Sequence, residues 1–271
     1  MNRMRISWLA LYVCVYLLFL YAPVLLLPIF SFNDSSIVAF PLSGFTLNWF
    51  ALLWQTETLH SAVRNSIMIA AITAIVSTML GLCAARAASR YAFRMKRGIM
   101  GLIMVPLVLP EIVVGVSLLV VILQFGFELS LWSIVLGHVL ICTPFSVVVL
   151  STAFNNLDRS LEEAAIDLGE TRWSTFRLIS LPLIMPGVIA SLLIAFTISL
   201  DEFIIAFFLA GTEVTLPVYI WSLLRFPARL PSVLALGTIL LAASLILLVS
   251  AEFIRRRGLR RTGATDRGGL F

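Results

Sequence analysis

Three acidic residues, Glu111, Asp201 and Glu202, lie inside long apolar stretches of the sequence. An ionised carboxylate in an apolar environment is costly unless it is paired or faces water. Acids in such positions therefore usually face a cavity and mark the path of a solute or an ion. Carboxylates of this kind would attract a cationic, amine-bearing solute, and the ring of Tyr21, in another apolar stretch, could add a cation–π contact.

A structural role is the alternative for each acid. Glu111 follows Pro110, and a carboxylate at the start of a helix is stabilised by the helix dipole. Asp201 has no adjacent proline, and Glu202 lies about 100° away from it around a helix, where it could contact a neighbouring subunit. Tyr21, Glu111 and Asp201 each lie about 13 residues from the predicted start of a span, which places all three about 20 Å above the same boundary.

Residues that would support catalysis or metal binding are sparse. The single lysine, Lys96, stands in the segment RMKR, whereas a phosphate-binding P-loop needs a lysine after a glycine and before a serine or threonine. We therefore expect no catalytic residue and no cofactor in this chain. No metal site is expected either, because the cysteines and histidines are isolated from one another. These residues are Cys14, Cys83, Cys142, His60 and His138, of which His138 is expected to pack between helices.

The candidate residues must be positioned by a framework that is itself apolar. Of the 271 residues, 61% are hydrophobic and 12% are charged, whereas a soluble domain has about 45–50% apolar and about 25% charged residues. Too few polar groups remain to cover a water-facing exterior, and the abundance of large aliphatic residues excludes disorder. We therefore predict an all-α integral membrane protein. The net charge of +5 is attributed to arginines that flank apolar spans, not to nucleic-acid binding.

Six stretches are long enough to cross a bilayer as helices, which takes about 20 apolar residues each. They cover residues 8–30, 62–85, 98–123, 132–153, 187–210 and 233–254. The first follows Arg3 and Arg5 like a signal peptide, but it is too long and lacks a cleavage site, so it is interpreted as an uncleaved span. Sixteen of the 19 Lys and Arg residues fall on the side of the N-terminus, which predicts that both termini lie inside the cell. We expect a single transmembrane domain over residues 1–271.

The segment at about 154–186 is the longest connection predicted inside the cell. Ser160 and Glu163 match a capping box, which predicts a helix from Leu161. The small side chains of Ala164 and Ala165 lie on one apolar stripe of this helix, where another protein could approach closely. Four acids surround the alanines against the basic trend of the other inner segments: Glu162, Glu163, Asp167 and Glu170.

The same segment contains clear signals for a bend. Gly169 suits the left-handed position after a helix, and Thr171 can cap a second helix that carries Trp173 and ends at Pro182. Two interpretations are open for this helix–bend–helix element. It is either a solvated amphipathic connector or a docking element for a cytosolic partner with a complementary groove.

The order of residues in this segment resembles the EAA loop of permeases of ATP-binding-cassette (ABC) importers. The pattern EAA, three residues, G, nine residues, I, one residue, LP is matched by Glu163-Ala164-Ala165, Gly169, Ile179 and Leu181-Pro182. Other segments resemble the second permease subunit of spermidine/putrescine transporters: residues 20–23, 31–33, 110–113 and 199–202. Those relatives usually carry aspartate where this chain has Glu111 and Glu202. The charge is the same, but the glutamate side chains reach further.

The resemblance implies a type I ABC importer permease fold in a bacterial inner membrane. It also implies a cytosolic ATPase dimer that binds ATP and magnesium, a second homologous permease subunit and a periplasmic solute-binding protein, with lipid around the spans and no nucleic acid. The residues implied to contact the ATPase are Leu161, Glu162, Glu163, Ala164, Ala165, Asp167, Gly169 and Trp173. The solute would be a small cation, such as a polyamine, that passes Tyr21, Glu111, Asp201 and Glu202.

An alternative is a proton-coupled secondary transporter with Glu111 and Asp201 as proton carriers. Such transporters usually contain internal inverted repeats, and no repeat is evident in this sequence.

Overall fold

The computed structural model describes the backbone of residues 8–262 and the side chains of residues 8–246. These residues form helices and no strand, apart from an isolated bridge between Asn33 and Phe45, which confirms the all-α prediction. Arg3, Arg5 and Arg267, which enter the predicted topology, lie outside the described residues. The orientation in the membrane therefore stays a prediction.

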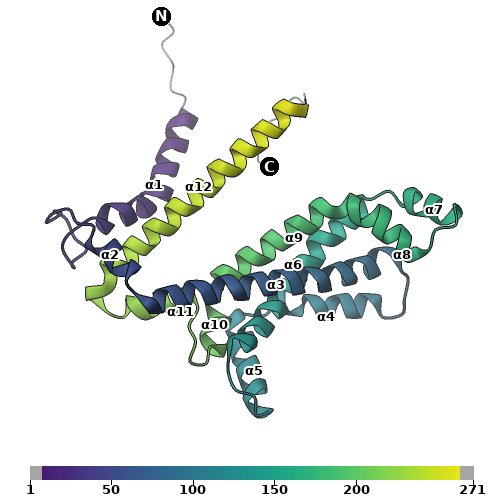
Figure 1. The fold of residues 1–271 in the computed structure, drawn as a ribbon, viewed down its shortest axis with the longest axis horizontal. Coiled ribbons are helices and arrows are strands. Elements are labelled where there is room, and N and C mark those ends of the chain that lie inside the picture. Colours follow the sequence, from purple (N-terminus) through teal and green to yellow (C-terminus); the bar gives the residue numbers. More distant parts are fainter. Residues whose placement is uncertain (1–7, 263–271) are drawn as a thin grey trace, which may run out of the picture. The chain divides into compact units, whose positions relative to one another are not determined.

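The helices follow one another along the chain as labelled in Figure 1. They are α1 (Trp8–Ser31), α2 (Asn48–Trp54), α3 (Glu57–Arg90), α4 (Lys96–Val108), α5 (Glu111–Gln124), α6 (Leu131–Asn156), α7 (Arg159–Asp167), α8 (Arg172–Thr175), α9 (Leu181–Asp201), α10 (Ile204–Leu209), α11 (Leu216–Leu224) and α12 (Leu230–Thr262). A π-helical segment, Phe176–Ser180, joins α8 to α9, and a 3₁₀ turn, Pro227–Arg229, precedes α12.

Five helical stretches in the described part of the chain are long and apolar enough to cross a membrane, and a bent helix pair could form a sixth span. The five agree in position with predicted spans, although α3, α6 and α12 extend beyond the predicted apolar stretches at both ends. The third predicted span, over residues 98–123, is a bent pair of helices, α4 and α5, that could together form one broken span. The chain bends by 105° between α4 and α5, because Pro110 lacks a backbone donor and holds Leu109 in an extended conformation.

The fifth predicted span, over residues 187–210, also differs from the structure. Its helix starts earlier, at Arg172, and ends at Asp201. Glu202 is extended, and its carboxylate accepts hydrogen bonds from the first turn of α10, so the chain starts a new short helix there. Both breaks lie next to the acids that the sequence predicted as a solute path.

Residues 58–219 form one of the two compact units of the chain, with α6 at its centre. In this unit α6 packs against α4, α5, α9 and α10, and α5 packs against α10 (Figure 1). The helices approach closely where a residue has no side chain, as at Gly81 of α3 against Ser146 and Gly137 of α6 against Ile205. The buried side chains of this core include Ile69, Ile134, Ile141, Cys142, Ala195, Ile205 and Leu209.

The other unit is formed by residues 1–57 and 220–271, in which α12 packs against α1 and α2. The connection between α1 and α2 is held by buried Asn33, whose Oδ1 accepts a hydrogen bond from the Ser43 N–H at 3.0 Å. The indole N–H of Trp49 donates to the carbonyl of Asn33 at 2.8 Å. Whether the two units form the single domain that was predicted over residues 1–271 depends on how they fit together. The single domain stays a prediction.

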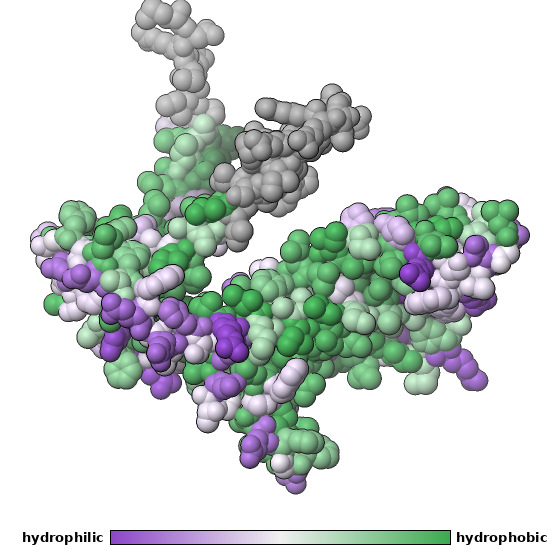
Figure 2. All heavy atoms as spheres, in the orientation of Figure 1, coloured by the Kyte–Doolittle hydropathy of each residue, from purple (hydrophilic) through white to green (hydrophobic). Residues whose placement is uncertain are grey.

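Many large apolar side chains lie on the outside of the helices. In the unit of residues 58–219, Figure 2 shows hydrophobic residues over the flanks of the helices and hydrophilic residues mainly near their ends. Examples are Met79 of α3, Leu102 of α4, Leu136 of α6 and Leu193 of α9, all more than half exposed. Such surfaces suit lipid tails or another apolar subunit.

The close approach of α3 and α6 makes a testable prediction. A Cβ added at Gly81 would lie 2.6 Å from the Cβ and 2.9 Å from the carbonyl carbon of Ser146, so Gly81→Ala should destabilise the purified chain by about 1–3 kcal/mol. The control is Gly101→Ala in α4, where a Cβ would meet nothing within 4 Å and stability should stay equal or rise by up to about 1 kcal/mol. Unfolding in detergent micelles measures both, and equal effects would contradict the packing.

Candidate functional site

The segment predicted to contact a partner begins with α7, which is capped at its N-terminus by Asp158. The Asp158 side chain accepts a hydrogen bond from the Ser160 N–H at 3.0 Å. The predicted capping box of Ser160 and Glu163 is therefore wrong, and the helix starts at Arg159 instead of Leu161. The bond stabilises the ionised carboxylate and lowers the pKa of Asp158. The contribution of this cap to stability is thus complete above the ordinary pKa of aspartate and is lost as the pH falls through the lowered pKa of Asp158.

The end of α7 is the predicted glycine bend. Gly169 has a φ of 94°, which lies in the left-handed region that favours glycine. The N–H of Glu170 donates to the carbonyl of Ala165, and the N–H of Gly169 donates to that of Ile166, the paired bonds of a Schellman motif. Thr171 then caps α8, because its hydroxyl accepts a hydrogen bond from the Ser174 N–H at 3.2 Å. Both predicted signals are confirmed.

The sequence predicted that the second helix ends at Pro182, and this prediction is wrong. The π-helical segment carries the chain from α8 into α9 without a break, and the N–H of Leu181 donates to the carbonyl of Phe176, five residues earlier. Pro182 is the second residue of α9 and directly follows the π-helical segment, so the helix continues through the proline. Residues 172–201 are consequently one helical stretch that begins at the bend and ends at Asp201.

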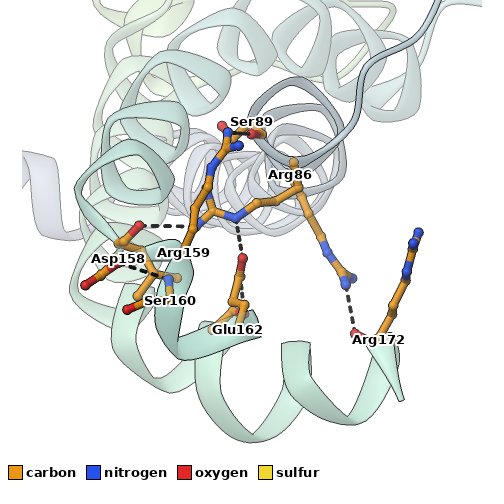
Figure 3. A network of polar contacts seen from close by, with 10 residues as sticks. Arg86, Ser89, Asp158, Arg159, Ser160, Glu162 and Arg172 are labelled. Atoms are coloured by element: carbon orange, nitrogen blue, oxygen red, sulfur yellow. Dashed lines mark hydrogen bonds and ion pairs between the residues drawn. The ribbon is translucent and has the colours of Figure 1, made fainter. Parts of the chain in front are cut away.

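Glu162 joins α7 to two other elements. Its Oε2 lies 2.5 Å from Nε of Arg90, at the end of α3, and its Oε1 accepts a hydrogen bond from the hydroxyl of Ser180 at 2.5 Å. The side chains of Arg90 and Glu162 are only 11% and 16% exposed. Figure 3 shows the Glu162 side chain directed from the loop toward the arginine side chains of the network. Glu162 therefore lies on the inner side of α7.

Two further arginines fix the loop to α3 (Figure 3). The guanidinium of Arg159 donates to the carbonyl of Ser89 at 2.5 Å. The guanidinium of Arg86 donates to the carbonyl of Arg172 at 3.1 Å and lies 4.0 Å above the ring of Phe176. These contacts connect both helices of the helix–bend–helix element to the same turn of α3, so the loop is attached to the helical bundle at more than one place.

The outer side of the element carries most of the residues predicted to contact a partner. Ala165 is buried beneath α7, and its small side chain lets the helix approach α8. The exposed members of the predicted set are Leu161, Glu163, Ala164, Asp167, Gly169 and Trp173. Leu168, which the prediction omitted, is 87% exposed, and Trp173 is 66% exposed. The sequence signal for Leu168 was its place beside Gly169, where the helix ends and its side chain has no neighbour to pack against.

The predicted solute-path acids of the 58–219 unit lie at the two helix breaks. Glu111 is the first residue of α5 and Asp201 is the last residue of α9, and both are exposed. Glu202 is buried, and its Oε2 accepts hydrogen bonds from the N–H groups of Ile205 at 3.0 Å and Ala206 at 3.4 Å. At this break the side chain of Asp201 is thus exposed, whereas that of the next residue, Glu202, is buried.

His138 of α6 supports the same break, which the sequence did not predict. Its Nε2 lies 3.7 Å from Oε2 of Glu202, and its Nδ1 lies 2.7 Å from the hydroxyl of Ser199. The imidazole is 1% exposed, so it packs between helices as expected and also contacts polar groups on both sides of Asp201. No spacing along the sequence could reveal contacts between residues that lie 61 and 64 positions apart.

Tyr21 lies on α1 in the other unit and is exposed. The prediction that it shares one level with Glu111 and Asp201 stays a prediction. Within the described part of the chain, no group of three or more His, Cys, Asp or Glu side chains is arranged to hold a metal ion. The predicted site residues of the 58–219 unit therefore lie in two separate places. One is the loop fixed to α3, and the other is the pair of helix breaks at Glu111 and Asp201.

Comparisons with known proteins show which family this chain resembles. Residues 77–259 match the family described as binding-protein-dependent transport system inner membrane component. The spermidine/putrescine transport system permease protein PotC of Escherichia coli (strain K12) is 36% identical over 239 residues, which cover 88% of this chain and 90% of the relative. The putrescine transport system permease protein PotI of the same strain is 40% identical over 233 residues, with 83% and 82% covered.

Solved structures give the fold. A chain of a bacterial ABC transporter involved in the import of the acidic polysaccharide alginate has a TM-score of 0.74 at 19% identity, and the match covers 92% of this chain and 93% of that one. A structure of a bacterial alginate ABC transporter in complex with an alginate pentasaccharide-bound periplasmic protein gives a TM-score of 0.72, also at 19% identity, with 92% of both chains covered. The likeness establishes the fold of ABC importer permeases.

The mostly buried side chain of Glu162 and the exposed side chain of Glu163 allow a matched test. Glu162→Ala should lower the free energy of unfolding by about 1–3 kcal/mol, because Arg90 and Ser180 lose their hydrogen-bond acceptor. Glu163→Ala, on the exposed face of the same helix, should change it by no more than about 0.5 kcal/mol. Thermal unfolding of the two purified variants measures the difference, and a larger loss for Glu163→Ala would refute the assignment.

Proposed function

Since this chain belongs to the family of inner membrane components of binding-protein-dependent transport systems, we propose that it imports a small cationic solute, a polyamine such as putrescine or spermidine. The chain is a multi-pass permease with the ABC importer fold. In the proposal it lies in a bacterial inner membrane and holds no cofactor itself. A cytosolic ATPase dimer binds ATP and magnesium and drives the transport step.

The observation that carries the proposal is the helix–bend–helix element held against α3. The outer side of α7 and α8 presents Leu161, Leu168 and Trp173, an apolar surface of the kind that a groove on a partner protein can bind. Exposed acids border these side chains, so a partner groove with basic edges would complement them. We assign this surface to the ATPase subunit.

The path from the ATPase to the solute follows from the helices. Residues 172–201 form one helical stretch from the bend to Asp201. A displacement of the loop by the ATPase would therefore move the break between α9 and α10 as well, without needing a flexible connection. Glu162 and Arg90 would transmit the same displacement to α3.

The solute is assigned from the acids at the helix breaks. Glu111 and Asp201 are exposed carboxylates next to non-helical backbone, and in membrane proteins such backbone usually lines a cavity or is buried in protein. Their negative charge favours an amine-bearing solute, and Tyr21 would add an aromatic contact. Relatives named for spermidine and putrescine transport agree with this choice. Glu202, which is buried, would not contact the solute directly but would stabilise the start of α10 through its hydrogen bonds.

Two further partners complete the transporter. A second, homologous permease subunit would cover part of the exposed apolar surface of the helices and close the solute path. A periplasmic binding protein would deliver the solute, and the bacterial alginate ABC transporter, which shares the fold, forms a complex with a periplasmic protein that carries an alginate pentasaccharide. The alternative of a proton-coupled secondary transporter leaves the element fixed to α3 without a role.

Neutralising the path acids tests the solute assignment. In proteoliposomes that contain the complete transporter, Glu111→Gln and Asp201→Asn should each lower the kcat/KM of putrescine uptake about tenfold or more, because each removes a charge-assisted contact. Glu128→Gln, at an exposed acid between α5 and α6, is the control and should transport normally. Normal uptake by both path variants would exclude these acids as the cation site.

Removing one exposed indole tests the docking surface. Trp173→Ala should lower the fraction of ATPase that co-purifies with this chain while leaving its unfolding temperature unchanged, because the side chain is 66% exposed. Trp132→Ala is a matched control, since Trp132 is 65% exposed at the start of α6. If Trp173→Ala retains as much ATPase as the control, the partner does not use this surface.

A further inference from the structure

A cavity of about 370 Å³ lies behind α7, between the helix–bend–helix element and the end of α3. Its walls come from α3, α7, α8 and the π-helical segment, all within the unit of residues 58–219. It lies between the element and α3, and Leu161, Leu168 and Trp173 are not among the residues that line it. Its walls contain four arginines: Arg86, Arg90, Arg159 and Arg172.

The cavity carries an excess of positive charge. Two acids, Glu162 and Glu163, also line it, and Glu162 is engaged by Arg90. Among the described residues, the other three arginines have no carboxylate partner. Arg86 and Arg159 each donate one hydrogen bond to a backbone carbonyl, and Arg172 lies 5.9 Å above the ring of Tyr91. A guanidinium has five N–H donors, so most donors of these arginines remain available.

A buried hydroxyl also belongs to this cavity. Thr175 is 3% exposed, and its Oγ1 has no hydrogen-bond partner among the described residues. A buried hydroxyl without a partner is unfavourable, and Thr175 forms part of the cavity wall. Thr175 therefore stands in the cavity wall with a hydroxyl that no other described residue engages.

The position of the cavity indicates where a ligand would come from. Arg86 and Arg90 stand at the end of one membrane-spanning stretch, and Arg172 stands at the start of another. The cavity is therefore at the polar ends of two stretches that are long enough to cross a membrane, outside their apolar parts, which is the side from which a lipid headgroup would approach it. The ring of Tyr91 also lines the wall.

We propose that this cavity binds a phosphate group between Arg86, Arg159 and Arg172, with the Thr175 hydroxyl as a further donor. Guanidinium groups bind phosphate oxygens through two parallel N–H donors, which suits an anion held between several arginines. The headgroup of an anionic phospholipid, such as phosphatidylglycerol, is the source that the position favours. Free inorganic phosphate is the other source of the same chemistry.

The bound phosphate would form a second connection between the loop and α3, beside the Glu162–Arg90 pair. Arg86 belongs to α3, Arg159 to α7 and Arg172 to α8, so one anion would hold three elements together. This inference goes beyond the proposed function, which assigns to the loop only its contact with the ATPase. It depends on the inner side of the element and not on the docking surface.

The test uses the complete transporter purified in detergent. Phosphatidylglycerol and phosphatidylcholine are titrated in parallel and bound lipid is counted by native mass spectrometry, while binding of inorganic phosphate is measured by calorimetry. The variants are Arg172→Gln, which removes one guanidinium, and Thr175→Val, which removes the hydroxyl and keeps the shape of the side chain. Arg94→Gln, an exposed arginine outside the cavity wall, is the matched control.

We expect the unmodified transporter to bind phosphatidylglycerol in preference to phosphatidylcholine. Arg172→Gln should bind phosphatidylglycerol about fivefold more weakly, and Thr175→Val should also bind it more weakly. Arg94→Gln should bind it like the unmodified transporter. The same pattern with inorganic phosphate, and no preference among lipids, supports the site with free phosphate as its source. The proposal is overturned if neither ligand binds, or if both cavity variants bind like Arg94→Gln. Either of these results would leave the ATPase contact of Trp173 unaffected.

Discussion

The carboxylate of Glu162 is the contact on which the mechanical role of the loop depends. It binds the guanidinium of Arg90 on α3 and the hydroxyl of Ser180 in the π-helical segment, in a setting where both charged side chains are mostly shielded from water. Shielding strengthens such a pair and makes the loss of one partner costly. A short helix held in this way cannot swing freely, so a force applied to its outer side is passed on to two membrane-spanning helices.

A second constraint acts at the other end of the same helical stretch. Backbone groups freed by a break in a membrane helix need partners, and at the end of α9 these come from Glu202, which accepts hydrogen bonds from the first turn of α10. His138 lies against Glu202 and Ser199 on either side of the break. This buried polar cluster leaves Asp201 exposed at the end of α9, where the proposed contact with a cationic solute needs it.

Much of this arrangement could be predicted from local sequence. The apolar stretches gave the positions of the spans, and Gly169 and Thr171 gave the bend, because a left-handed residue and a helix cap depend on a few neighbouring residues. Continuity through Pro182 and the sharp bend before Pro110 were not predicted, since a proline in an apolar stretch can either start a helix or break one, and packing decides between them. The partners of Glu162, Glu202 and His138 were out of reach for another reason. Periodicity tells which face of a helix a residue occupies, but not which helix lies opposite.

The central claim is that the Glu162–Arg90 pair couples ATP hydrolysis to movement of the membrane helices. The most direct measurement is the number of ATP molecules hydrolysed per putrescine imported, in proteoliposomes with the complete transporter carrying Glu162→Gln. The account predicts that this ratio rises, because the ATPase still binds the intact outer surface and hydrolyses ATP while fewer cycles move the helices. A ratio equal to that of the unmodified transporter would contradict the account.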